Sequence, residues 1–228
     1  MNSKEEYYIG VCVKDTNSEN GPGHVSSFVH KVKNDVPKTD HFSFFPGPLG
    51  SLLNGLTFGS IPVFGQYAPD HKEDIKEADD VLLKKVTKDQ YKKAKQAQKE
   101  LKNEVDSKEC FYSVFEYQNP FISAATQLLI GGTGAKLSVK NHVSQTGCFL
   151  PECFDGSIGT MYRDEHHPAT ELKLTVDNCS SSVARILNKA DVSFKNPVIP
   201  TFFKQVMQEQ GFVKVEKDKL NSIGIKLD

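Results

Sequence analysis

The sequence has no long apolar run, and this absence argues against a membrane-spanning protein. Its longest apolar stretch, about Phe121 to Ile130, is too short for a spanning helix, which needs about 20 residues. The start, Met1 to Glu6, is polar and has neither the basic flank nor the apolar centre of a signal peptide. We therefore expect no membrane span, and a location that is either cytoplasmic or reached by a signal-peptide-independent route of secretion into a host cell.

An excess of charge of one sign is also absent. The chain has 28 Lys and Arg against 29 Asp and Glu, a formal net charge of -1 and an isoelectric point near 6.7. Proteins that bind nucleic acid or anionic membranes usually carry a basic face. The totals therefore predict no nucleic-acid partner.

The cysteines are too few, and odd in number, for a disulfide framework. Five cysteines in 228 residues are an odd number in a large chain without an export signal, so they are expected to be free thiols. They are Cys12, Cys110, Cys148, Cys153 and Cys179. The apolar content of 38% and charged content of 25% are typical of a soluble globular protein with a real core.

Hydrophobic periodicity predicts an α+β fold in a single domain, residues 1–228, with a possible insertion at 118–170. The N-terminal part should form an antiparallel meander, and residues 46–69, rich in Gly, Pro and aromatics, a long loop. The charged segment Asp70–Val105 has helical spacing, and Thr87 with Gln90 is a helix-start pattern. Expected strands are Tyr7–Val13, His24–Lys33, His41–Phe45, Glu109–Tyr117, Lys173–Val176 and Phe212–Glu216; expected helices are Phe121–Leu129, Ser180–Ala190 and Pro200–Gln210.

The stretch from Asp177 to Leu187 carries the strongest chemical signal. Cys179 stands where the strand pattern of residues 170–176 gives way to a helix. The positive end of a helix favours the thiolate, which is the reactive form of cysteine. Cys179 is therefore the predicted nucleophile, with its backbone N–H as one oxyanion donor and Asn178 as support or helix cap.

A partner for this thiol is expected near the N-terminus. His24 follows Gly23 and opens an apolar strand, so it is the predicted general acid–base. His30 lies on the same face of that strand and is a rival for this role.

The early Gly23-His24 pair and the late Asn178-Cys179 pair resemble the circularly permuted papain-like cysteine hydrolases. This group includes the NlpC-like permuted proteins, the lecithin retinol acyltransferase-like enzymes and the PPPDE-type isopeptidases. The resemblance implies a permuted papain-like fold, an antiparallel sheet or barrel packed against a Cys-bearing helix. It also implies a polar residue on the next strand that orients His24, for which His41 is the candidate and Asp40 and Ser43 are rivals.

The resemblance implies a cysteine peptidase or amidase that cleaves an amide, isopeptide or (thio)ester bond through an acyl-enzyme. Expected substrates are a peptide, a ubiquitin-like protein tail, or an acyl or amide compound. Acyl transfer by the same pair, and a non-catalytic binding or effector protein on the same scaffold, are the alternatives.

No cofactor or metal is expected. A zinc set of Cys148, Cys153, His166 and His167 matches no common ligand spacing. The glycine-rich stretch 131–134 lacks the Lys-Ser/Thr ending of a phosphate loop, so it is interpreted as a turn.

Overall fold

The computed structural model describes residues 5–16, 23–47, 50, 62–114, 175–197 and 199–227. The chain divides into two compact units. The first comprises Met1–Phe45, Gln66–Asp106 and Asn178–Asp228, and the second Pro46–Gly65 and Ser107–Asp177. The predicted insertion at 118–170 and the predicted helix Phe121–Leu129 lie outside the described residues.

The first unit is built on a five-stranded antiparallel sheet of order β3-β2-β1-β6-β9. Its strands are β1 (Glu5–Lys14), β2 (His24–Lys33), β3 (Val36–Phe42), β6 (Asp80–Lys85) and β9 (Val213–Val215). The predicted α+β class and the N-terminal antiparallel meander are thus confirmed.

The third strand begins earlier than the predicted start at His41. Asn34 and Asp35 have φ angles of 50° and 62°, and two consecutive left-handed residues make a tight hairpin turn. The chain therefore re-enters the sheet at Val36, and Pro37 pairs with Val32 inside the edge strand.

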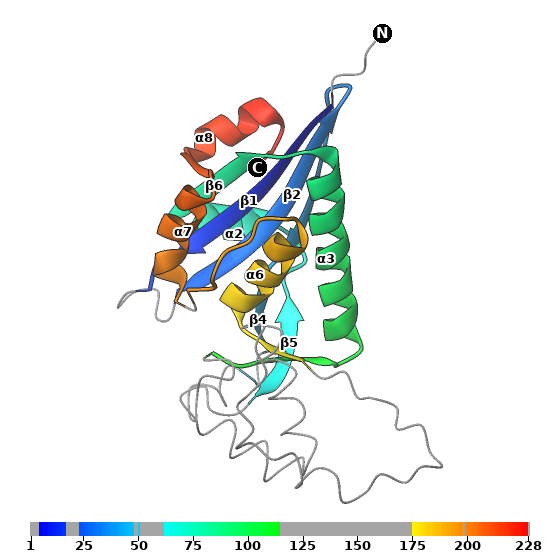
Figure 1. Ribbon diagram of the computed structural model, residues 1–228, viewed down its shortest axis with the longest axis vertical. Coiled ribbons are helices and arrows are strands. Elements are labelled where there is room, and N and C mark those ends of the chain that lie inside the picture. Colours follow the sequence, from blue (N-terminus) through cyan, green and yellow to red (C-terminus); the bar gives the residue numbers. More distant parts are fainter. Residues whose placement is uncertain are drawn as a thin grey trace, which may run out of the picture. The chain divides into compact units, whose positions relative to one another are not determined.

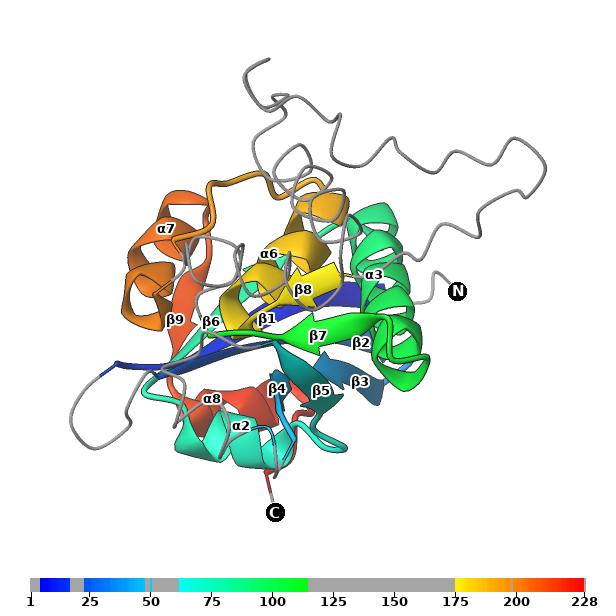
Figure 2. The same cartoon turned by 90° about the horizontal axis from the view of Figure 1, so that it is seen from below.

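Helices cover both faces of this sheet (Figure 2). On one face lie α3 (Lys88–Asp106) and α6 (Cys179–Lys189), which contact each other and β2 (Figure 1). On the other face lie α2 (Lys72–Glu77) and α8 (Lys217–Leu220). The Cys-bearing helix is thus packed on the antiparallel sheet.

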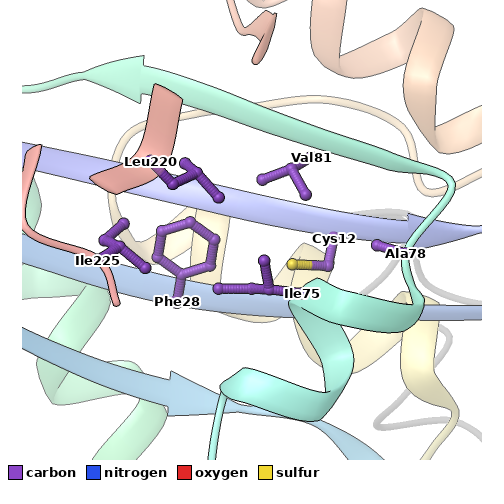
Figure 3. Packing of buried hydrophobic residues seen from close by; sticks show 7 residues of the cluster. All are labelled: Cys12, Phe28, Ile75, Ala78, Val81, Leu220 and Ile225. Atoms are coloured by element: carbon purple, nitrogen blue, oxygen red, sulfur yellow. The ribbon is translucent and has the colours of Figure 1, made fainter. Parts of the chain in front are cut away.

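The core beneath α2 and α8 is shown in Figure 3, where Phe28 lies among side chains from both helices. The cluster consists of Cys12, Phe28, Ile75, Ala78, Val81, Leu220 and Ile225. Gly10 makes room for the Phe28 ring, since a Cβ at that position would lie 2.0 Å from Phe28 Cζ. Alternate β1 residues, among them Ile9 and Val11, are fully buried on the opposite face.

The segment Asp70–Val105, in which helical spacing was predicted, also contains a strand, because β6 separates α2 from α3. Val81 and Leu82 are both buried, as expected of a strand that is covered on both faces, and such an apolar run is ambiguous by periodicity alone. The predicted helix start is confirmed: the Gln90 amide donates to Thr87 Oγ1 at 3.2 Å, and the Thr87 amide donates to Gln90 Oε1 at 3.2 Å.

The C-terminal segment is helical where a helix was predicted, with small differences in its bounds. The predicted helix Pro200–Gln210 is a 3-10 turn, η3 (Pro200–Phe202), followed by α7 (Phe203–Glu209). Gly211 follows with φ 81°, the left-handed conformation that commonly ends a helix. The turns α8 and η4 (Asn221–Ile223) were not predicted.

In the second unit β7 (Cys110–Tyr112) pairs with two strands. It runs antiparallel to β5 (Val63–Tyr67) at Val63 and Phe64, and parallel to β8 (Thr175–Asp177). β5 lies inside the region predicted as a loop. The strands β4 (Phe44–Pro46) and β5 each have residues in both units. β8 is the strand that leads directly into Asn178.

Candidate active site

Cys179 is the first residue of α6, and Asn178 caps that helix. Asn178 Oδ1 accepts from the Ser181 amide at 2.7 Å, and Ser181 Oγ accepts from the Asn178 amide at 2.8 Å. This reciprocal pair fixes the start of the helix. Because the first amides of a helix have no acceptor within it, the N–H of Cys179 makes no hydrogen bond inside α6.

Cys179 is buried. The His24 imidazole and the Val25 amide hydrogen-bond to its sulfur. Burial raises the pKa of the thiol, but these partners outweigh burial and bring the pKa below its usual value.

The pKa of His24 is shifted in the opposite direction from that of Cys179. Burial lowers the pKa of its imidazole, but the hydrogen bond to Cys179 and the negative charge of Asp74 outweigh burial and raise the pKa. The Lys14 ammonium opposes this rise. A lowered thiol pKa beside a raised imidazole pKa favours the thiolate–imidazolium pair.

Gly23 explains why His24 begins the strand at this point. Gly23 has φ 71°, and a Cβ there would lie 2.5 Å from the Lys14 carbonyl oxygen and 2.9 Å from the Thr16 amide nitrogen. Only glycine therefore fits between the end of β1 and the start of β2. The register then sets His24 opposite Lys14.

Val25 reaches the sulfur because β3 stops short of it. The β2–β3 pairing ends at Ser27 with Phe42, so Val25 lies beyond the last residue that β3 pairs. Its amide donates to Cys179 instead. The end of β2 thus supplies both a side chain and a backbone donor to the thiol.

The second ring nitrogen of His24 contacts Ser43. His24 Nε2 lies 2.7 Å from Ser43 Oγ, and Ser43, between β3 and β4, is 2% exposed. Ser43 was a rival for the orienting position that the resemblance implied for His41. Since Nε2 is engaged by Ser43, Nδ1 is the ring nitrogen left for the sulfur.

His41 bonds to Asp74 rather than to His24. Its Nε2–H donates to Asp74 Oδ2 at 2.7 Å, and Ser43 also hydrogen-bonds to the Asp74 carboxylate. Burial raises the pKa of Asp74, but the bonds from His41 and Ser43 and the charge of His24 outweigh it and bring the pKa to about 2. Asp74 is therefore ionised at neutral pH.

Asp74 was missed by the sequence interpretation. It lies on α2, in the first turn of a short helix within a stretch of mixed charges. Its carboxylate side chain is 18% exposed, yet its neighbours in sequence, Glu73 and Lys76, are solvent-exposed. No pattern in the sequence separates it from these surface charges.

The two other rivals are engaged elsewhere. His30 Nδ1 contacts Thr39 Oγ1 at 2.9 Å and its Nε2 contacts the Ile223 carbonyl oxygen at 2.8 Å, so this buried ring fastens the C-terminal segment to the sheet. Asp40 forms an ion pair with Lys95 at 2.7 Å.

Two more cysteines are described, Cys12 and Cys110, and both are buried. Cys12 belongs to the apolar core, and burial raises the pKa of its thiol. Cys110 Sγ lies 3.7 Å from Asp177 Oδ2 in the second unit. The Cys179 thiol thus has a histidine partner, whereas the Cys12 thiol lies among apolar side chains.

The described residues contain no group of three or more His, Cys, Asp or Glu able to hold a metal ion. The zinc candidates Cys148, Cys153, His166 and His167 and the glycine-rich stretch 131–134 lie outside the described ranges. Among the described helices, none combines the length and apolar character needed to cross a bilayer.

Compared with protein-family models, with curated proteins and with solved structures, the chain has no significant match.

Proposed function

We propose that this protein is a cysteine hydrolase that cleaves an amide, isopeptide or (thio)ester bond, with Cys179 as nucleophile and His24 as general acid–base. The observation that carries the proposal is the buried hydrogen bond between the Cys179 thiol and the His24 imidazole, at the start of a helix. A base held against a thiol at the positive end of a helix is the usual means of activating cysteine for covalent catalysis.

In the first half-reaction the thiolate attacks the substrate carbonyl carbon, and the carbonyl π electrons move to oxygen. The N–H of Cys179 donates to that oxyanion at the start of α6. The tetrahedral intermediate collapses, the C–N or C–O bond (C–S in a thioester) breaks, and the leaving group takes the Nδ1 proton of the His24 imidazolium. The product is a thioester between substrate and Cys179.

In the second half-reaction neutral His24 takes a proton from water at Nδ1, and the hydroxide attacks the thioester. The C–S bond then breaks, the acid is released, and the thiolate–imidazolium pair is restored. An acyl acceptor other than water would give acyl transfer by the same two residues.

The order of these residues in the chain supports a place among the permuted papain-like hydrolases. The histidine strand β2 precedes the Cys-bearing helix α6, and that helix packs on an antiparallel sheet. A peptide, a ubiquitin-like tail and an acyl or amide compound all have a carbonyl that this pair would attack.

The test uses an iodoacetamide probe at neutral pH, with the labelled site mapped by peptide mass spectrometry. The wild type should be labelled fastest at Cys179. Cys179→Ala should abolish this fast labelling, whereas Cys12→Ala, which removes a core thiol, should retain it. Circular dichroism checks that each variant is folded.

Catalysis is tested separately with an activated ester such as p-nitrophenyl acetate. A burst of nitrophenol equal to the enzyme concentration, followed by slow turnover, is the expected signature of an acyl-enzyme. His24→Gln should remove the burst. A wild type whose Cys179 reacts no faster than a free thiol, and which gives no burst, would overturn the proposal and favour a non-catalytic binding protein.

A further inference from the structure

Ser43 lies between two groups that compete for its single hydroxyl hydrogen. On one side is His24 Nε2, at 2.7 Å, and on the other the Asp74 carboxylate. The serine is 2% exposed, so the protein itself sets the direction of both hydrogen bonds.

Asp74 decides that direction. An ionised carboxylate only accepts hydrogen bonds, so the hydroxyl of Ser43 must donate to Asp74. Ser43 Oγ then accepts from His24, and Nε2 must carry a hydrogen. Neutral His24 in this arrangement has its lone pair on Nδ1, which is the nitrogen left for Cys179.

We propose that Asp74 is a positioning residue that fixes the tautomer of His24 through Ser43 and thereby makes Nδ1 the atom that exchanges a proton with Cys179. The inference rests on the proposed role of the Cys179–His24 pair. A carboxylate commonly sets the tautomer of a catalytic histidine by direct contact; here a serine hydroxyl lies between them.

His41 completes the arrangement from the other side of the carboxylate. Its Nε2–H donates to Asp74 Oδ2 at 2.7 Å, and its side chain is 4% exposed. This buried donor keeps the carboxylate in place and compensates part of its charge. The predicted orienting residue thus acts on His24 through Asp74 and Ser43.

Several charged groups act on this site from the surrounding elements. Asp74 on α2 raises the pKa of His24, and Lys14 on β1 lowers it. His71, just before α2, lies near His41 with ring centroids 6.4 Å apart and tilted ring planes, and it pairs with Asp70 at 3.1 Å. Because several groups act on His24, a change in the pH dependence of alkylation is attributed to Asp74 only if the same change at a neighbouring carboxylate has no effect.

The experiment measures the His24 tautomer directly, by nitrogen chemical shifts of the imidazole ring in ¹⁵N-histidine-labelled protein. In the wild type Nε2 should carry hydrogen whether His24 is neutral or charged. In Asp74→Asn the new amide donates to Ser43, whose hydroxyl then turns to His24. Nε2 should become an acceptor, and hydrogen should move to Nδ1.

The same variants are alkylated with iodoacetamide across pH. Asp74→Asn should raise the pKa of the Cys179 thiol by about one unit, which is about a tenfold loss of thiolate on the acid side of its titration. The control is Glu73→Gln, which makes the same change at the adjacent, solvent-exposed position of α2 and should leave both readouts unchanged.

Ser43→Ala provides a second test that leaves the Asp74 carboxylate in place. It should weaken the Nε2–H preference, because it removes the acceptor. Unaltered tautomer populations in either folded variant would overturn the inference. If the tautomer responds as expected but wild-type Cys179 reacts like an ordinary thiol, the positioning role stands and the proposed hydrolase function fails.

Discussion

The backbone amide of Val25 donates a hydrogen bond to the sulfur of Cys179. The strand β2 therefore contacts the thiol twice, through this amide and through the side chain of His24. Both contacts are set by the point at which β2 begins. A change that moves this point should weaken the stabilisation of the thiolate even if no side chain of the site is altered.

Gly23→Ala is the direct test of that dependence. The added Cβ would approach the Lys14 carbonyl oxygen to 2.5 Å, and the position has φ 71°. We expect a loss of unfolding free energy of about 1–3 kcal/mol, measured by urea denaturation, together with slower alkylation of Cys179.

Gly211→Ala is the matched control. Gly211 also has a positive φ, 81°, but the nearest atoms to its added Cβ are 3.9 Å away on the Lys84 side chain. It should cost about 1 kcal/mol and leave the alkylation rate unchanged. Equal effects of the two variants on alkylation would show that the start of β2 does not control the thiol.

The pH dependence of Cys179 alkylation is a second prediction. Because the pKa of this thiol lies below its usual value of 9.0, the thiolate should persist at pH values where ordinary cysteines are protonated. The rate should fall only when the pH drops below this lowered pKa.

His24→Gln should shift this pH profile to higher pH. Burial raises the pKa of Cys179 in the absence of the imidazole, so the rate at pH 7 should drop by at least about tenfold. Stopped-flow alkylation gives the profile, and Cys12→Ala serves as the control with an unchanged one. A His24→Gln profile that overlays the wild type would contradict the pairing.

Asn178 offers a test that separates helix capping from thiol chemistry. Asn178→Ala removes the side chain that accepts from the Ser181 amide and should cost about 1 kcal/mol of unfolding free energy. Asn178→Asp keeps an acceptor there and should preserve stability. Its negative charge, one residue before Cys179, should nevertheless raise the thiol pKa and slow alkylation. In this variant stability should therefore be unchanged while the alkylation rate falls.

The proposed pairing of Cys179 with His24 was predicted from the sequence. Each has a local signal: a small polar residue before a helix for Cys179, and a glycine before an apolar strand for His24. Their hydrogen bond joins elements far apart in the chain, so no local pattern contains it. It was expected from the two residue types and from a resemblance, and in the structure the His24 imidazole bonds to the thiol.

The rest of the site depends on contacts that leave no trace in local periodicity. Ser43 was only one of three polar residues near the third strand, because choosing among them needs the direction in which β3 ends. Asp74 was hidden among surface charges of similar spacing. The strand β6 lies in a segment to which helical spacing was assigned, since adjacent apolar residues such as Leu82 and Leu83 do not distinguish a buried strand from a helix. Only pairing with the neighbouring strands β1 and β9 decides between the two.

Asp74 should also make the stability of the protein depend on acid pH. Its pKa is lowered from 3.8 to about 2, so the folded state binds this proton more weakly than the unfolded state. The stabilisation is complete above about pH 4 and is lost as pH falls toward 2; by linkage it amounts to about 2 kcal/mol. Urea unfolding of wild type and Asp74→Asn should be measured between pH 5 and 2 in steps of about one pH unit. The free energy of unfolding should depend less steeply on pH in the variant. Glu73→Gln, which alters an exposed carboxylate of the same helix, should follow the wild type, and a parallel decline in all three proteins would show that the buried carboxylate does not hold its charge through His41 and Ser43.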